Sequence, residues 1–350
     1  ALAEPLAGLG RYYRDNGQLE QAQGHYRRAL HIVRVNDGLY SQRQAPILRE
    51  LLDGYRSTGD MEGLDDRYEY YFRLYGNGQP PFSELRLRAA LEFLRWQREA
   101  LLLGLGEPKQ RMLDLYRLNE ELLERTAGDP EVELAWRREL TLSQLRNLYL
   151  LQNRFTPTIE TKGIIPASNY FGAVTQAQDL QDRSIDNIYR NSLTAGSGLL
   201  LELIDASSQA PVADRARLLL ELGDWYHWND QRYRATDYYG QVAALLRESG
   251  EGELLDEWLG QPVELPDNGA FMKPLASPGE SSLVVVTASY DVSATGRVRN
   301  LEASADSEEG QSQASKVRRY LSKTRFRPRY LSGQGEEVDG VRREYVLLQP

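Results

Sequence analysis

The chain has 350 residues, of which 41% are apolar and 27% charged, and this length is enough for an extended helical array plus a smaller second domain. The absence of cysteine excludes disulfides, thiolate nucleophiles and zinc–thiolate sites, and no window approaches the roughly 18 consecutive apolar residues of a membrane-spanning helix. The formal net charge of −9 is concentrated in residues 1–280, with 31 basic and 42 acidic side chains, so we expect no binding to nucleic acid, whose phosphates such a surface repels.

A helical hairpin pattern opens the chain, with a turn at residues 15–17 between its two helices. Small residues stand where two helix backbones would cross, and leucine and tyrosine would fill the layers on either side. The residues that carry this pattern are Leu9, Gly10, Tyr13, Ala22 and Tyr26.

Two further stretches repeat the same offsets. In residues 48–71 leucines replace the small residues, and a turn is expected at residues 57–60. The other copy lies much further along the chain and comprises Leu222, Gly223, Tyr226, Ala235 and Tyr239.

The pattern resembles the tetratricopeptide (TPR) repeat, whose consensus places Leu-Gly and then Tyr on one helix, and Ala followed by an aromatic residue on the next. One repeat cannot bury its own apolar face, so the resemblance implies neighbours stacked into a solenoid. We therefore expect a mostly α fold, with a TPR-like α-solenoid of helical hairpins over residues 1–258. Because Tyr13 and Tyr55 are 42 residues apart, six hairpins would fit that length.

The intermediate copies are degenerate, but glycine and Asp-Pro boundaries mark helices at residues 83–103, 108–127 and 131–153. Residues 155–173 contain two prolines and little helical period, which predicts a long loop. We favour a connector that packs along the groove of the solenoid, with a ligand-gripping loop as the alternative.

The composition changes after residue 258. Proline and glycine in residues 259–280 predict an extended linker. Residues 281–350 predict a small α+β domain of order ββαβ, with Gly296 in the first turn and Ala314, Val317 and Leu321 facing the core. The expected elements are strands at 283–292 and 297–305, a helix at 311–324 and a strand at 341–348.

The last 70 residues resemble the C-terminal domain of TonB-like energy transducers. The strongest match is Arg325-Phe326-Arg327-Pro328 after the amphipathic helix. The remaining matches are Tyr290-Asp291-Val292, Gly296-Arg297-Val298, Gly333 and Tyr345-Val346-Leu347. The chain departs from the family before residue 283, where its Tyr-Pro is missing and no long proline-rich spacer stands upstream. The resemblance implies the fold and an envelope location more than energy transduction.

Catalytic chemistry is not indicated by any motif. His25, His31 and His227 are too scattered for a metal site, since the helical metal signature needs a spacing of three or four residues. No phosphate-binding loop, dinucleotide fingerprint or serine-hydrolase elbow is found. We therefore expect no cofactor, no metal and no enzymatic activity.

Aromatic residues are the first candidate for partner binding. Tyrosine outnumbers phenylalanine by 21 to 7, and Tyr68, Phe72 and Tyr75 share one face of an expected helix. They would either pack between helices or line a concave surface that grips a peptide.

Basic residues are the second candidate. Seven of them fall within 14 positions, namely Lys316, Arg318, Arg319, Lys323, Arg325, Arg327 and Arg329, and we single out Arg318, Arg319, Arg325 and Arg327. One interpretation is a solvated helix face with Phe326 as the core anchor. The alternative is a surface that docks on the acidic solenoid or on an acidic partner, beside a closing strand that accepts an extended segment.

These patterns favour a non-enzymatic scaffold of the Gram-negative cell envelope, which binds a protein or peptide. The alternatives are an accessory of a TonB-type energised uptake system at the outer membrane and a catalytic domain hidden in the loop at 155–173. The first 30 residues carry charge and repeat pattern in place of a signal-peptide core, so for a periplasmic protein we expect the targeting segment upstream.

Overall fold

A computed structural model of the chain describes residues 2–157, 174–272, 283–305, 308–331 and 333–348. It divides into two compact units, Ala1–Tyr189 with Phe271–Gly279 and Arg190–Ala270 with Glu280–Pro350. The division falls inside a helix and not after residue 258, so the last helical hairpin belongs with the C-terminal domain. Most of the expected loop at 155–173 and part of the expected linker lie outside the described residues.

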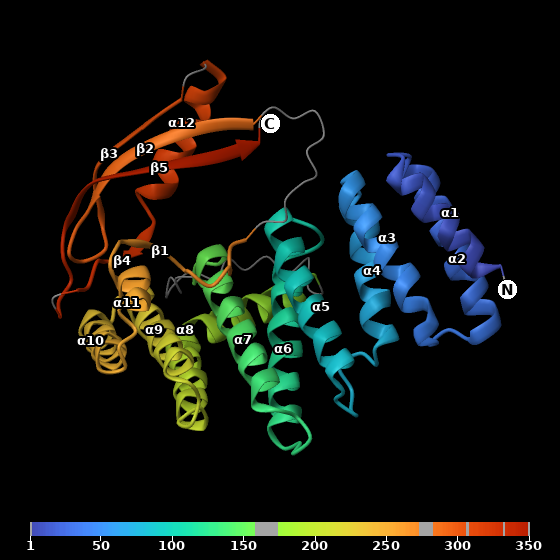
Figure 1. Cartoon of the computed structure of the whole chain (residues 1–350), viewed down its shortest axis with the longest axis horizontal. Coiled ribbons are helices and arrows are strands. Elements are labelled where there is room, and N and C mark those ends of the chain that lie inside the picture. Colours follow the sequence, from blue (N-terminus) through green and yellow to red (C-terminus); the bar gives the residue numbers. More distant parts are fainter. Residues whose placement is uncertain (1, 158–173, 273–282, 306–307, 332, 349–350) are drawn as a thin grey trace. The chain divides into compact units, whose positions relative to one another are not determined.

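The first unit is helical. In chain order it contains α1 (Ala3–Asp15), α2 (Leu19–Asp37), a 3-10 turn η1 (Gln42–Gln44), α3 (Ala45–Thr58), α4 (Met61–Leu74), α5 (Glu84–Leu103), α6 (Pro108–Ala127), α7 (Leu134–Arg154) and the first part of α8 (Val174–Ala206). Consecutive helices from α1 to α7 pack against each other, drawn from blue to green in Figure 1. The expected helical hairpins are therefore present.

The hairpin residues show why this sequence folds in this way. Ala22 and Tyr26 are buried, and a Cβ added to Gly10 would lie 2.5 Å from the ring of Tyr26. Glycine is thus required for an aromatic ring to pack against the facing helix. Leu9 was expected in this core, but its side chain is 45% exposed.

Several of the expected hairpins are present in the described residues. These residues contain the hairpins α1/α2, α3/α4, α5/α6 and α9/α10, while α7 packs on both α5 and α6. The period is not uniform because the middle helices are long: α5 and α6 have 20 residues each, and α8 has 33. No helix in the described part has the length and apolar character needed to cross a membrane.

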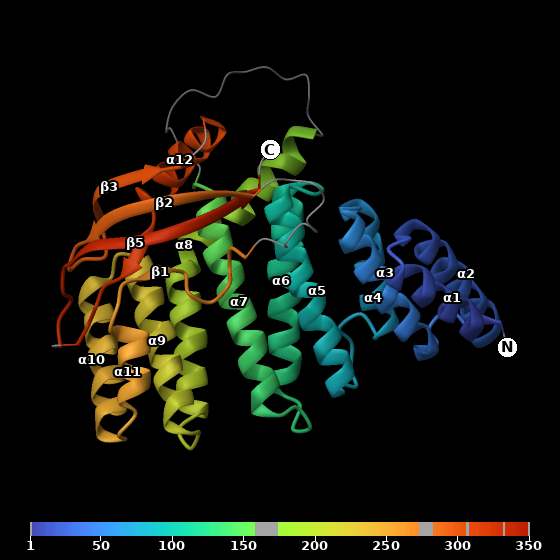
Figure 2. The same cartoon turned by 45° about the horizontal axis from the view of Figure 1, so that its top comes forward.

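The second unit joins the last helices to a small sheet. It contains the end of α8, α9 (Val212–Trp228), α10 (Arg232–Glu248), α11 (Gly252–Leu259), β1 (Val263–Leu265), β2 (Leu283–Val292), β3 (Val298–Ser304), α12 (Glu308–Leu321), β4 (Arg325–Arg327) and β5 (Val338–Leu348). The antiparallel sheet has the order β3-β2-β5, and α12 packs on β2 and β3 (Figure 2). A second, two-stranded sheet pairs β1 with β4.

The ββαβ order is present, with one addition and one correction. Ala314, Val317 and Leu321 face the core as expected, together with Phe326. The expected linker is partly wrong, because residues 263–265 form β1 and pair with residues 325–327. This pairing attaches the segment after α11 directly to the small domain.

The last hairpin provides a test of the repeat assignment. Leu222, Tyr226, Ala235 and Tyr239 are all buried, and a Cβ on Gly223 would lie 2.7 Å from Cε1 of Tyr239. We expect Gly223→Leu to lower the free energy of unfolding by about 1 to 3 kcal/mol, because the larger side chain overpacks this crossing.

Thermal denaturation of the intact chain measures this effect. Gly240→Leu is the matched control, since Gly240 lies on the neighbouring helix α10 and an added Cβ there meets nothing within 4 Å. Equal melting temperatures for the two variants would contradict the assigned register.

Candidate protein-binding cavity

A cavity of about 740 Å³ lies in the first unit and is formed mainly by α3, α4 and α5. Three arginines and three acidic residues line it beside apolar and aromatic side chains. The lining residues are Arg49, Leu52, Asp53, Arg56, Tyr68, Glu92, Arg95, Trp96, Glu99 and Met272. A volume of this size suits a few side chains of a bound segment.

An aromatic pair forms one part of the lining. The rings of Tyr68 and Trp96 are stacked, with their centroids 4.9 Å apart and an interplanar angle of 10°. The indole Nε1 of Trp96 donates to Asp65 Oδ1 at 2.7 Å, and the guanidinium of Arg56 lies 5.6 Å from the indole centroid. Trp96 is buried and Tyr68 is half-buried, so Tyr68 is the ring that a bound segment can reach.

Ion pairs cross the cavity between α3 and α5. Arg56 Nη2 lies 3.0 Å from Glu99 Oε2, and Arg49 Nη2 lies 3.4 Å from Glu92 Oε1. Glu99 also accepts a hydrogen bond from Nε of Arg95, one turn earlier on the same helix. These contacts hold the acidic side chains of α5 in place.

Asp53 differs from the other charged residues of the cavity. Its carboxylate makes no hydrogen bond or ion pair among the described residues. Desolvation by the surrounding side chains, and secondarily the charge of Glu50, raise the pKa of Asp53 above its ordinary value. The charges of Arg56, Arg49 and Arg14 lower that pKa in part, and the Asp53 side chain is exposed, so a cationic or hydrogen-bonding group of a ligand can reach it.

The structure separates the three aromatic candidates. Tyr68 lines the cavity, but Phe72 and Tyr75 are buried and are corrected here to packing residues. Phe72 stacks on Phe93 with ring centroids 4.4 Å apart, and Tyr75 packs against Tyr71 at 5.0 Å. Phe93 of α5 covers Phe72, whereas Tyr75, the residue that follows α4, packs against a ring of α4 itself.

The basic candidates within residues 316–329 also fall into two groups, exposed side chains and side chains that bind acidic residues of the second unit. Arg318 and Arg319 on α12 are exposed. Arg327 was a partner-binding candidate, but it is 1% exposed and binds Asp224 at 3.3 Å and Asp267 at 2.9 Å. Arg327 is therefore corrected to an internal ion-pairing residue that joins β4 to α9.

Two neighbours of Arg327 complete this contact. Arg325 donates to Asp230 Oδ2 at 2.8 Å, so its charge is also largely taken up within the unit. Asp224 accepts a hydrogen bond from Tyr239 at 2.9 Å, and burial raises the pKa of Asp224 to about 7. Burial lowers the pKa of the adjacent His227 to about 4, which keeps its ring neutral at pH 7. Arg325 and Arg327 therefore bind acidic side chains at the end of α9 and just after it, within the second unit.

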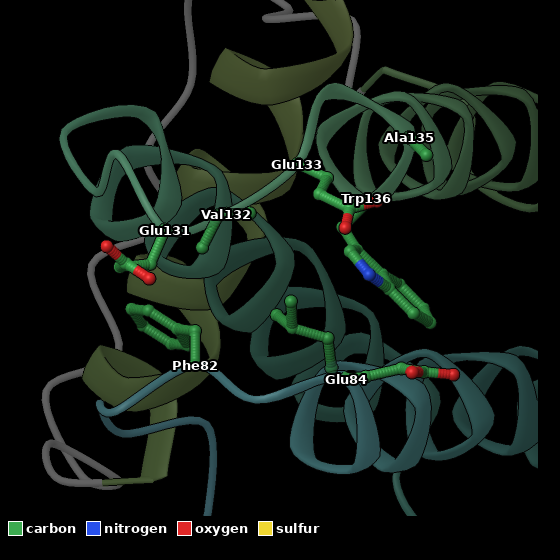
Figure 3. Close-up of a pocket in the computed structure, with 8 residues that line it drawn as sticks. Phe82, Glu84, Glu131, Val132, Glu133, Ala135 and Trp136 are labelled. Atoms are coloured by element: carbon green, nitrogen blue, oxygen red, sulfur yellow. The ribbon is translucent and has the colours of Figure 1, made fainter.

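A second, smaller cavity of about 350 Å³ lies at the start of α5 and α7 in the first unit. Figure 3 shows Phe82 and Trp136 on opposite sides of it, with Glu131 beside Phe82. Glu84 lies in the first turn of α5, and Glu133 is at the N-cap position of α7 without a side-chain hydrogen bond to the helix. Two of the three carboxylates therefore lie at helix N-termini, where a negative charge is stabilising.

Sequence reasoning missed most of the larger cavity. Asp53, Arg95 and Glu99 were not singled out, although the offset between the paired arginines and glutamates, 43 residues, is almost the repeat length. The signal in the sequence that could have indicated this cavity was the pairing of an arginine with a glutamate 43 residues later. Within the described residues no cluster of histidine and acidic side chains is placed to hold a metal ion.

No protein-family model matches the chain, and no curated protein matches it. Among solved structures, the TPR-like repeats of a Podosopora anserina protein described as a kinesin light chain are 15% identical, covering 70% of this chain and 95% of that chain with a TM-score of 0.44. A circular tandem repeat protein is 13% identical, covering 74% of this chain and 62% of that chain with a TM-score of 0.33. Because both TM-scores are below 0.5, we describe the helical repeats as TPR-like on the basis of how their hairpins pack and not on these similarities.

Proposed function

We propose that this chain is a protein-binding scaffold, and that the cavity formed by α3, α4 and α5 takes a segment of a partner protein. The observation that carries the proposal is the accessible Tyr68 ring, stacked on Trp96 and flanked by charged side chains from two helices. Rigid aromatic rings beside arginines are typical of the residues that dominate binding energy at protein interfaces. TPR-like helical repeats also commonly present such surfaces to protein partners.

A displayed library of random 12-residue peptides tests this proposal. The library is selected on the intact protein, and the enriched peptides are measured by calorimetry. We expect Tyr68→Ala and Arg95→Glu each to weaken binding about tenfold, which is the effect of losing roughly 1.4 kcal/mol at a binding hot spot.

The control variants are Tyr12→Ala and Arg27→Glu, which replace exposed side chains of the same unit outside the cavity. Circular dichroism and thermal melting verify that every variant is folded. Peptides that bind all four variants equally well, or a selection that enriches none, would contradict a binding role for this cavity.

The finer proposal is that the scaffold works in the periplasm of a Gram-negative bacterium, with the C-terminal domain as a second binding module. Its support is the ββαβ order and the Arg325-Phe326-Arg327-Pro328 element, together with β5, which pairs only with β2 among the described strands. Fractionation of cells that produce the native protein tests the location, and recovery in the cytoplasmic fraction would exclude it.

A further inference from the structure

We propose that the cavity on α3–α5 recognises a partner segment carrying one basic and one acidic side chain close together, the basic one bound by Asp53 and the acidic one by Arg95. This inference rests on the proposed function and names the chemistry of the partner. It follows from how the charges of the cavity are paired.

The charges on the two helices alternate with opposite signs. On α3, Asp53 lies one turn from each of Arg49 and Arg56, and the three side chains are spaced for one helix face. On α5 the corresponding sequence is acidic, basic and acidic, formed by Glu92, Arg95 and Glu99. Both helices therefore carry a central charge flanked by two charges of the opposite sign.

The outer charges are paired across the cavity, but the central ones are not. Arg49 with Glu92 and Arg56 with Glu99 each join residues 43 positions apart. Asp53 makes no hydrogen bond or ion pair among the described residues, although the charges of Arg56 and Arg49 act on it from a distance. Arg95 donates only its Nε, to Glu99 on its own helix. The side chain of Arg95 is 67% exposed, so its two terminal nitrogens remain available to a ligand.

Charge complementarity selects the partner. A segment with only acidic side chains would meet Asp53 as a like charge, and one with only basic side chains would meet Arg95 in the same way. A neutral amide can bond both groups, but charge-assisted hydrogen bonds are about twice as strong as neutral ones. One cation and one anion therefore fit the centre of the cavity best.

Apolar contacts are available for the stems of such side chains. Tyr68 offers its half-buried ring, and Met272, which is 60% exposed, lines the same cavity with a flexible thioether. Long charged side chains commonly lay their methylene groups along such surfaces while their charged ends reach a partner.

The experiment is a charge reversal on both sides of the interface, using the peptides enriched from the 12-residue library. Asp53→Lys and Arg95→Glu are each expected to lower the affinity for the parent peptide about tenfold or more, as reversal of a close charge pair does at interfaces. A peptide in which the basic residue becomes glutamate should bind Asp53→Lys within about threefold of the original affinity. Likewise, a peptide in which the acidic residue becomes lysine should bind Arg95→Glu within about threefold of the original affinity.

The outcomes separate the two proposals. Enriched peptides that need Tyr68 but carry charges of one sign, or none, would overturn the inference and leave the scaffold function standing. The same holds if reversed peptides fail to rescue the reversed variants. Peptides whose binding is insensitive to Tyr68 would reject both proposals. Tyr12→Ala and Arg27→Glu are again the controls, because these two side chains lie outside the cavity.

Discussion

Replacing Arg327 with methionine is expected to lower the stability of the second unit by about 3 to 5 kcal/mol, the range for removing one partner of a buried ion pair. Arg327 is 1% exposed and bonds both Asp224 and Asp267, and Asp224 is itself 3% exposed. The substitution leaves the Asp224 carboxylate buried without its cation. The loss of stability arises more from this uncompensated buried charge than from the lost attraction between Arg327 and the two carboxylates.

The effect of Arg327→Met should depend on pH. Burial already raises the pKa of Asp224 to about 7, well above its ordinary value near 4, and removal of the cation raises it further. A folded-state pKa above the unfolded one favours folding at low pH, and that contribution is lost as pH rises through the folded pKa. The variant should therefore be less impaired at pH 5 than at pH 8.

Native-state hydrogen exchange of the α9 and β4 amides measures this stability in the intact chain. Arg342→Met is the control, because Arg342 lies exposed on β5 and its loss should change stability by less than about 0.5 kcal/mol. Adding Asp224→Asn to Arg327→Met should restore part of the loss. Equal protection in the Arg327 and Arg342 variants would show that the buried pair does not stabilise the unit.

We expect Gly296→Ala to destabilise the second unit by about 3 to 5 kcal/mol, because a backbone cost and an overpacking cost add at this position. Gly296 has a φ of +70°, a conformation that costs an alanine about 1 to 3 kcal/mol. An added Cβ would also lie 1.9 Å from the carbonyl oxygen of Phe326 and 2.7 Å from Nε2 of His227. Because the Gly296 carbonyl accepts a hydrogen bond from the Phe326 amide, the backbone there has little room to move.

Gly333→Ala separates the two causes. Gly333 has a φ of +90°, but a Cβ there meets nothing within 4 Å, so its variant reports the backbone cost alone. Chemical denaturation of both variants, followed by exchange at β3 and β4, gives the difference. If the two substitutions lower the free energy of unfolding by the same amount, close packing at Gly296 contributes nothing to the effect of Gly296→Ala.

Local patterns predicted the elements but not the fate of individual side chains. Tyr68 and Phe72 occur on the same face of α4, yet only Tyr68 reaches a cavity, because Phe93 of α5 covers Phe72. Which ring remains accessible depends on residues from the next helix. Likewise β1 and β4 have three residues each, too few for a recognisable alternation, and they form only because they pair with each other.

The helical hairpins, the turn at Gly296 and the inward face of α12 could be predicted from local patterns, because each depends on residues a few positions apart whose spacing follows the helix or strand period. The sequence did not show that Arg327 is buried while Arg318 is exposed, or that Asp53 makes no ion pair while Arg95 pairs only with Glu99 of its own helix. Burial and charge pairing depend on residues far apart in the chain, here by 43 positions across the cavity and by 103 between Asp224 and Arg327.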